Sequence, residues 1–81
     1  MWMSNIIIVV NENNADRNAM ADLAAAVAEA GAQCINVDAS CGVIEAAVPA
    51  HEVPTIVAMD GVSYVRSVFT YFCNEVPPQA A

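Results

Sequence analysis

The sequence predicts an α+β fold in which strands and helices follow the order βαββαβ. Two observations lead to this prediction. Runs of β-branched residues alternate with segments of helical periodicity, and glycine, proline and asparagine separate these segments at turn positions. The chain has 81 residues, which is enough for one domain. We place that domain at residues 1–73 and expect residues 74–81, which include two adjacent prolines, to form an irregular tail.

The first predicted strand is the run Ile6–Val10. Every residue in it is β-branched, which is typical of a strand that is buried on both faces near the middle of a sheet. Polar residues follow, and we expect Asn13 or Asn14 to cap the next helix by accepting a hydrogen bond from a free amide. Asp16 adds a negative charge at a helix N-terminus, where the helix dipole favours one.

The first predicted helix covers residues 15–30, where apolar residues recur at three- and four-residue spacing. Polar side chains lie on the opposite face of this helix. Gly31 is expected to end it, because glycine readily adopts a positive φ. The predicted apolar face consists of Ala19, Met20, Leu23, Ala24, Val27 and Ala30.

The second half of the chain predicts three strands and one short helix. In residues 33–38, Ile35 and Val37 alternate with Cys34, Asn36 and Asp38, which predicts a strand. After a turn, residues 43–48 return as a third strand, so the two are expected to form a hairpin. Residues 51–59 predict a short helix, with Pro54 in its first turn, where a missing N–H does no harm. The turn Asp60-Gly61 then leads into a last strand that ends at Phe72.

This order of elements predicts a ferredoxin-like, or split βαβ, arrangement. Right-handed crossovers place both helices on one face of a four-stranded antiparallel sheet, with the first and third strands in its centre. The other face of the sheet is then left open. Strict alternation along the last strand puts Val65, Phe69 and Tyr71 on one face and Arg66 and Phe72 on the other. Either assignment leaves large apolar side chains on the open face.

Composition supports a protein partner and argues against several other ligands. Hydrophobic residues make up 58% of the chain, more than a core of this size holds, so an exposed apolar surface and a homo-oligomer are expected. Nine acidic residues against Arg17 and Arg66 give a net charge of −7, which excludes binding to nucleic acid and disfavours an anionic membrane. The apolar run near the N-terminus is too short for a signal peptide or a membrane span. A cytoplasmic protein is therefore expected.

No residue pattern predicts an enzyme, a metal site or a cofactor. The cysteines, Cys34, Cys41 and Cys73, are odd in number and lack CxxC or CxxH spacing, so we expect reduced thiols. His51 is the only histidine, and no serine or cysteine lies at a spacing that implies a catalytic triad. A phosphate-binding glycine loop is also missing from the sequence, because Gly42 stands alone.

The stretch INVDASCGVIEAAVPAHEVPTIVAMDGVSYV resembles the subtilisin propeptide and the related free-standing proteinase inhibitors. In that family a strand reaches a Val-Asp turn, and a short helix later leads into a final strand with a Val-x-Tyr-Val pattern. Val37-Asp38-Ala39 matches the turn, and Val62-Ser63-Tyr64-Val65 matches the final strand. The resemblance covers about residues 5–72.

The resemblance implies a specific binding mode. Family members pack the open sheet face on the protease and send the residues after the last strand into its cleft as an added strand. By this resemblance Phe72 would fill the primary specificity pocket, and Phe69 would fill the pocket three residues earlier. Nine residues follow Phe72 here, so such binding requires cleavage after Phe72 or a path for these residues out of the cleft. With no protease domain downstream, the usual propeptide role is not expected.

Two functional hypotheses follow. The first is a small non-catalytic interaction module that self-associates, or docks on a protein, through its open sheet face. The second is a propeptide-like inhibitor or folding chaperone of a subtilisin-type serine protease, with the segment from Phe69 to Phe72 in the substrate cleft. The residues assigned to partner binding are Val65, Arg66, Phe69, Tyr71 and Phe72.

Overall fold

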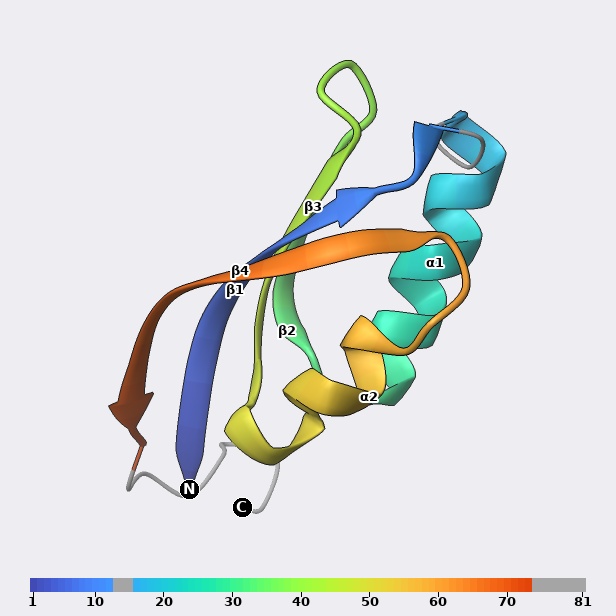
Figure 1. Cartoon of the computed structure of the whole chain (residues 1–81). Helices are drawn as coiled ribbons and strands as arrows, with labels where there is room; N and C mark the ends of the chain where they lie inside the picture. Colours follow the sequence, from blue (N-terminus) through green and yellow to red (C-terminus); the bar gives the residue numbers. More distant parts are fainter. Residues whose placement is uncertain (13–15, 74–81) are drawn as a thin grey trace.

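The computed structural model describes residues 1–12 and 16–73. Its four strands form one antiparallel sheet in the order β2-β3-β1-β4, and both helices lie on the same side of that sheet (Figure 1). The predicted α+β class and the central place of the first and third strands are therefore confirmed. The elements are β1 (Trp2–Val10), α1 (Arg17–Glu29), β2 (Gln33–Asp38), β3 (Val43–Pro49), the 3-10 turn η2 (Ala50–Glu52), α2 (Val53–Val57) and β4 (Val62–Phe72).

Strand β1 is longer than the β-branched run that predicted it. It begins at Trp2, because its first residues pair on both sides: Met3 lies opposite Pro49 of β3 and opposite Tyr71 of β4. Ser4 has little β propensity of its own but is buried, and its hydroxyl lies 2.8 Å from that of Thr70 on β4. The sheet therefore extends the strand toward the N-terminus.

Helix α1 begins two residues later than expected. Asp16 is the N-cap, and its carboxylate accepts a hydrogen bond from the backbone N–H of Ala19 at 2.7 Å. The predicted caps Asn13 and Asn14 lie outside the described residues, as does the predicted irregular tail, residues 74–81. Gly31 follows the C-cap with φ of +97°, so the predicted end of the helix is confirmed.

The hydrophobic core lies between the sheet and the helices. Alternate residues of β1 and β3 point toward α1, whose predicted apolar face supplies the buried side chains on the opposite side. Ile56 of the short helix α2 is fully buried and closes one end of the core. The buried residues of this cluster are Ile6, Ile8, Val10, Met20, Leu23, Val27, Ile44, Ala46, Val48 and Ile56.

Strand β4 contains two irregularities that the sequence did not predict. Its register against β1 shifts by one residue twice, and Ser63 and Val68 are the two residues of β4 that have no partner opposite them. Each shift corresponds to a β-bulge, an extra residue that interrupts the alternation of side chains between the two faces. The strict alternation assumed for β4 is therefore wrong.

The bulges change which face several predicted residues occupy. Val65 pairs with the fully buried Ile8 and packs against the core, so its predicted place beside Phe69 and Tyr71 is wrong. Arg66 lies opposite Ile7 and shares the open face with Phe69 and Tyr71, rather than with Phe72 as strict alternation predicted. The bulge at Val68 brings these three residues together, because it reverses the alternation between residues 66 and 69.

Candidate functional site

The candidate site is the open face of the sheet, whose central part consists of three rows of side chains that run across the strands. Beyond them, at the end of the sheet, lies a fourth row that consists of Tyr71, Met3 and Pro49. In the central row, Ile7 of β1 lies between Arg66 of β4 and Glu45 of β3. Neighbouring strands are about 4.8 Å apart, so Arg66 and Glu45 stand on opposite sides of Ile7 at about 10 Å from each other along the sheet. Asn36 of β2 continues this row and donates a hydrogen bond from Nδ2 to Oε1 of Glu45 at 3.3 Å.

The rows on either side of the central one are apolar except for the hydroxyl of Tyr64 and the amide of Asn5. In both rows the β4 residue is aromatic and the β3 residue is smaller, so the face is high along β4 and lower along β3. Of the β4 residues, Tyr64 and Phe69 each expose 53% of their surface. One row consists of Tyr64, Val9 and Val43, and the other of Phe69, Asn5 and Ala47.

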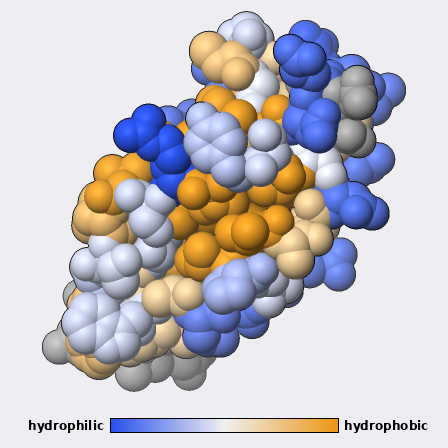
Figure 2. All heavy atoms as spheres, viewed as in Figure 1, coloured by the Kyte–Doolittle hydropathy of each residue, from blue (hydrophilic) through white to orange (hydrophobic). Residues whose placement is uncertain are grey.

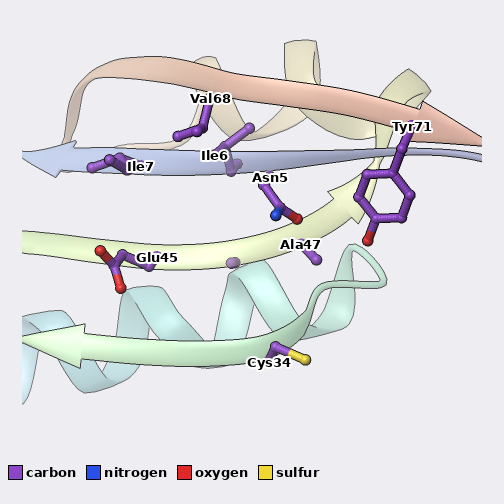
Figure 3. Close-up of a pocket in the computed structure, with 9 residues that line it drawn as sticks. Asn5, Ile6, Ile7, Cys34, Glu45, Ala47, Val68 and Tyr71 are labelled. Carbon is purple, nitrogen blue, oxygen red and sulfur yellow. The ribbon is translucent and has the colours of Figure 1, made fainter.

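This difference in height produces a shallow hollow of about 510 Å³ on the open face (Figure 3). In that view the helices lie behind the sheet, and the labelled side chains come from all four strands. Ile7 and Ala47 contribute apolar surface, while Glu45 and Tyr71 contribute polar atoms at the margins. The full lining is Asn5, Ile6, Ile7, Cys34, Glu45, Ala46, Ala47, Val68 and Tyr71.

The structure divides the predicted partner-binding residues into three groups. Arg66, Phe69 and Tyr71 lie together on the open face, with the rings of Phe69 and Tyr71 centred 5.4 Å apart. Val65 packs against the core. Phe72 pairs with Trp2 at the end of the sheet, where the two rings meet edge to face at 5.2 Å.

Sequence reasoning missed Ile7, Glu45 and Tyr64 as members of the site. The carboxylate of Glu45 is one of several scattered along the sequence, and nothing local distinguishes it from the others. Its place in the row with Ile7 depends on the pairing of β1 with β3. The alternation of β1 was the available signal, because it places Ile7 on the face opposite to Ile6.

The last residues of β4 are held in the sheet. The segment from Phe69 to Phe72 pairs with Trp2–Asn5 of β1, residue by residue. Beyond it, the N–H of Cys73 donates to the carbonyl of Met1 at 2.8 Å, and the N-terminal ammonium of Met1 donates to the carbonyl of Cys73 at 2.9 Å. This segment is therefore a paired strand of the sheet and not a free extended arm.

Groups with chemical reactivity are dispersed in the described part of the chain. His51 is exposed and lies 3.6 Å from the carboxylate of Glu52. The cysteines are free and exposed, and residues 1–12 and 16–73 contain no cluster of three or more metal-ligating side chains. The hydroxyl of Ser40 is the main cause that lowers the pKa of Asp38, which also accepts a hydrogen bond from the backbone N–H of Cys41. These contacts stabilise the turn between β2 and β3.

A second apolar area lies on the side of the molecule where β4 runs in front. Figure 2 shows hydrophobic side chains gathered there, between β4 and the helices, with polar side chains around them. Val53, Met59, Val62 and Val65 are half-buried and pack against the core, so this area is the rim of the core. Val57 of α2, which is 50% exposed, is the most exposed large apolar residue of that helix.

Comparisons with known proteins add no relative. No protein-family model, curated protein or solved structure matches this chain. Within the described residues, neither helix is long and apolar enough to cross a membrane.

Proposed function

We propose that this chain is a small non-catalytic interaction module of ferredoxin-like fold that self-associates through its open sheet face. The observation that carries the proposal is the uncovered apolar face centred on Ile7. The antiparallel pairings and the strand order β2-β3-β1-β4 support the assignment to the ferredoxin-like class.

The composition of β1 supports the need for a covering partner. An antiparallel sheet with one face in water normally alternates apolar residues on the core side with polar residues on the solvent side. β1 departs from this pattern, because Ile7 and Val9 occupy the solvent side between the buried Ile6, Ile8 and Val10. The neighbouring strands add further apolar side chains to the same face. An exposed apolar patch of this kind typically marks an interface.

A second copy of the chain is the occupant that the composition favours. The face carries two charges of opposite sign in its central row, so it is electrostatically complementary to itself. Dimers that use one patch twice are the commonest homo-oligomers and require no second gene product. A different protein would need an acidic group opposite Arg66 and a basic group opposite Glu45.

The protease-inhibitor hypothesis remains a prediction that the geometry does not favour. Pairing of the segment from Phe69 to Phe72 with β1 leaves only the outer edge of β4 for a protease cleft. Titration of the chain against purified subtilisin tests this hypothesis directly. Tight inhibition with a cut after Phe72 would favour the inhibitor over the interaction module.

Sedimentation equilibrium on the wild type and on two matched variants tests the proposed function. Phe69→Asp places a carboxylate on the open face, and we expect it to abolish self-association. Val57→Asp makes the same kind of change at a residue of similar exposure on the helix side, and we expect the assembly to survive. A wild-type chain that stays monomeric at hundreds of micromolar would refute the proposal. Loss of the assembly in Val57→Asp but not in Phe69→Asp would also refute it and would place the interface beside α2.

A further inference from the structure

We infer that two copies join their open faces about a two-fold axis parallel to β1, so that Arg66 of each copy faces Glu45 of its partner. This inference rests on the proposed self-association and specifies its geometry. A two-fold axis that lies between the facing sheets and runs along β1 exchanges the positions on either side of that strand. It therefore lays β4 of one copy over β3 of the other.

The charges of the central row support this axis. Arg66 and Glu45 flank Ile7 in adjacent strands, and the axis above Ile7 places each of them over its opposite. Among the described residues Arg66 makes no ion pair, and Glu45 accepts a single hydrogen bond, from Asn36. Both groups are thus available to a partner. Facing sheets pack about 10 Å apart, a distance that an arginine and a glutamate side chain together can span.

The sizes of the flanking side chains support the same axis. It places the ring of Phe69 over the partner's Ala47, and the ring of Tyr64 over the partner's Val43. The protruding aromatic side chains of β4 in one copy then pack into the hollow above the smaller side chains of β3 in the other. Aligned sheets cross at about 30°, so this match is closest around the point above Ile7 where the central row meets the axis.

The other symmetric arrangement of the same faces is unfavourable. A two-fold axis perpendicular to β1 through Ile7 would place Arg66 over the partner's Arg66, and Glu45 over the partner's Glu45. Like charges facing each other at an interface are destabilising. The aromatic residues of β4 would also meet each other, while a gap would remain over the small residues of β3. Charge and shape therefore select the axis parallel to β1.

The inferred arrangement also sets the number of subunits. An isologous contact uses the same patch on both copies, so a third copy finds no free patch of this kind after two chains have joined. The outcome is a closed dimer. The buried face comprises β3, β1 and β4 of each copy, because β2 extends past the partner's edge strand β4. It is three strands wide and about six residues long, roughly 14 by 20 Å, which is small for a protein interface. We therefore expect a dimer whose dissociation constant lies in the micromolar range.

Charge-reversal variants test the geometry. Arg66→Glu places two glutamates opposite each other at both symmetric contacts, and Glu45→Arg does the same with two arginines. Each single variant is expected to weaken dimerisation by at least about tenfold, a change of about 1.4 kcal/mol. Arg17→Glu and Glu29→Arg change the net charge equally at exposed positions on α1, and these controls should dimerise like the wild type.

Combinations of the two reversals restore the complementary charges. The double variant Arg66→Glu/Glu45→Arg should form a homodimer again, and this recovery excludes misfolding as the cause of the losses. Mixing the two single variants should yield a heterodimer with a one-to-one mass ratio, because each acidic residue then faces an arginine. Sedimentation equilibrium on the separate and mixed samples measures all of these species.

The outcomes separate this inference from the proposed function. If Phe69→Asp abolishes the assembly but both charge reversals leave it intact, self-association through the open face stands and the inferred axis is refuted. A trimer or larger assembly of the wild type also refutes the axis. If neither Phe69→Asp nor the reversals have an effect, the proposed function and the inference fail together.

Discussion

Replacement of Val65 and Phe69 by aspartate tests the bulged register of β4, from which the open face is derived. Strict alternation would put the two side chains on one face, and the two variants would then behave alike. In the structure Val65 packs on the core beside Ile8, whereas Phe69 is 53% exposed on the other face. The bulge at Val68 separates them.

The expected losses of stability differ by about 2 kcal/mol. Full burial of a valine side chain contributes about 2 kcal/mol, so the half-buried Val65 contributes about 1 kcal/mol. A carboxylate on the core adds a desolvation cost of about 2 kcal/mol, for a total of about 3 kcal/mol. Phe69→Asp removes one exposed ring contact with Tyr71, which costs about 1 kcal/mol. A chain of this length has a free energy of unfolding of about 4–12 kcal/mol, so both variants should fold.

Urea unfolding followed by far-ultraviolet circular dichroism measures these losses, at a protein concentration where the wild type is monomeric. With a slope of about 1 kcal/mol per molar urea, the midpoint should fall by roughly 3 M for Val65→Asp and by roughly 1 M for Phe69→Asp. Equal shifts, or a larger shift for Phe69→Asp, would refute the bulged register. The three rows of the open face would then have to be assigned again.

Three further predictions concern the core, the edge strand and the turn. Met20→Ala removes a fully buried side chain, and we expect a loss of about 3 kcal/mol in urea unfolding; a loss below about 1 kcal/mol would contradict its place in the core. Cys34→Gly should raise the free energy of unfolding by about 0.5 kcal/mol, because Cys34 has φ of +55°, which strains a residue with a Cβ. A lower urea midpoint for this variant would show that the thiol makes a stabilising contact. The folded-state pKa of Asp38 lies below its ordinary value of 3.8. The ionised carboxylate therefore stabilises the fold at pH values above 3.8, and this contribution is lost as the pH falls through the lowered pKa. Ser40→Ala should move that pKa back toward 3.8 in a titration of the carboxyl carbon by nuclear magnetic resonance, and an unchanged titration would exclude the hydroxyl as its main cause.

Local patterns were sufficient to predict most of the fold. The helical spacing of residues 15–30 identified the face of α1 that carries the buried Met20, Leu23 and Val27. Gly31 marked the helix end because only a residue without a Cβ adopts its φ without strain. The turn between β2 and β3 was likewise readable from its composition. Each of these features depends on residues a few positions apart.

The candidate site was predicted only in part. Arg66, Phe69 and Tyr71 were assigned to partner binding from their place in an apolar strand, and they lie together on the open face. Val65 was grouped with them because the alternation of β4 was assumed to be regular. The start of β1 at Trp2 was missed for a related reason, since pairing with both neighbouring strands extends it there.

The order of the elements and most of the core follow from short-range patterns in the sequence, because helical spacing, β-branched runs and turn residues act over short stretches of chain. Which residues share the open face depends on how the strands pair with one another. The bulges at Ser63 and Val68 arise where β4 pairs with β1, and the row of Arg66, Ile7 and Glu45 requires three strands in register. Register depends on contacts between distant segments, and a shift of one residue moves a side chain to the other face.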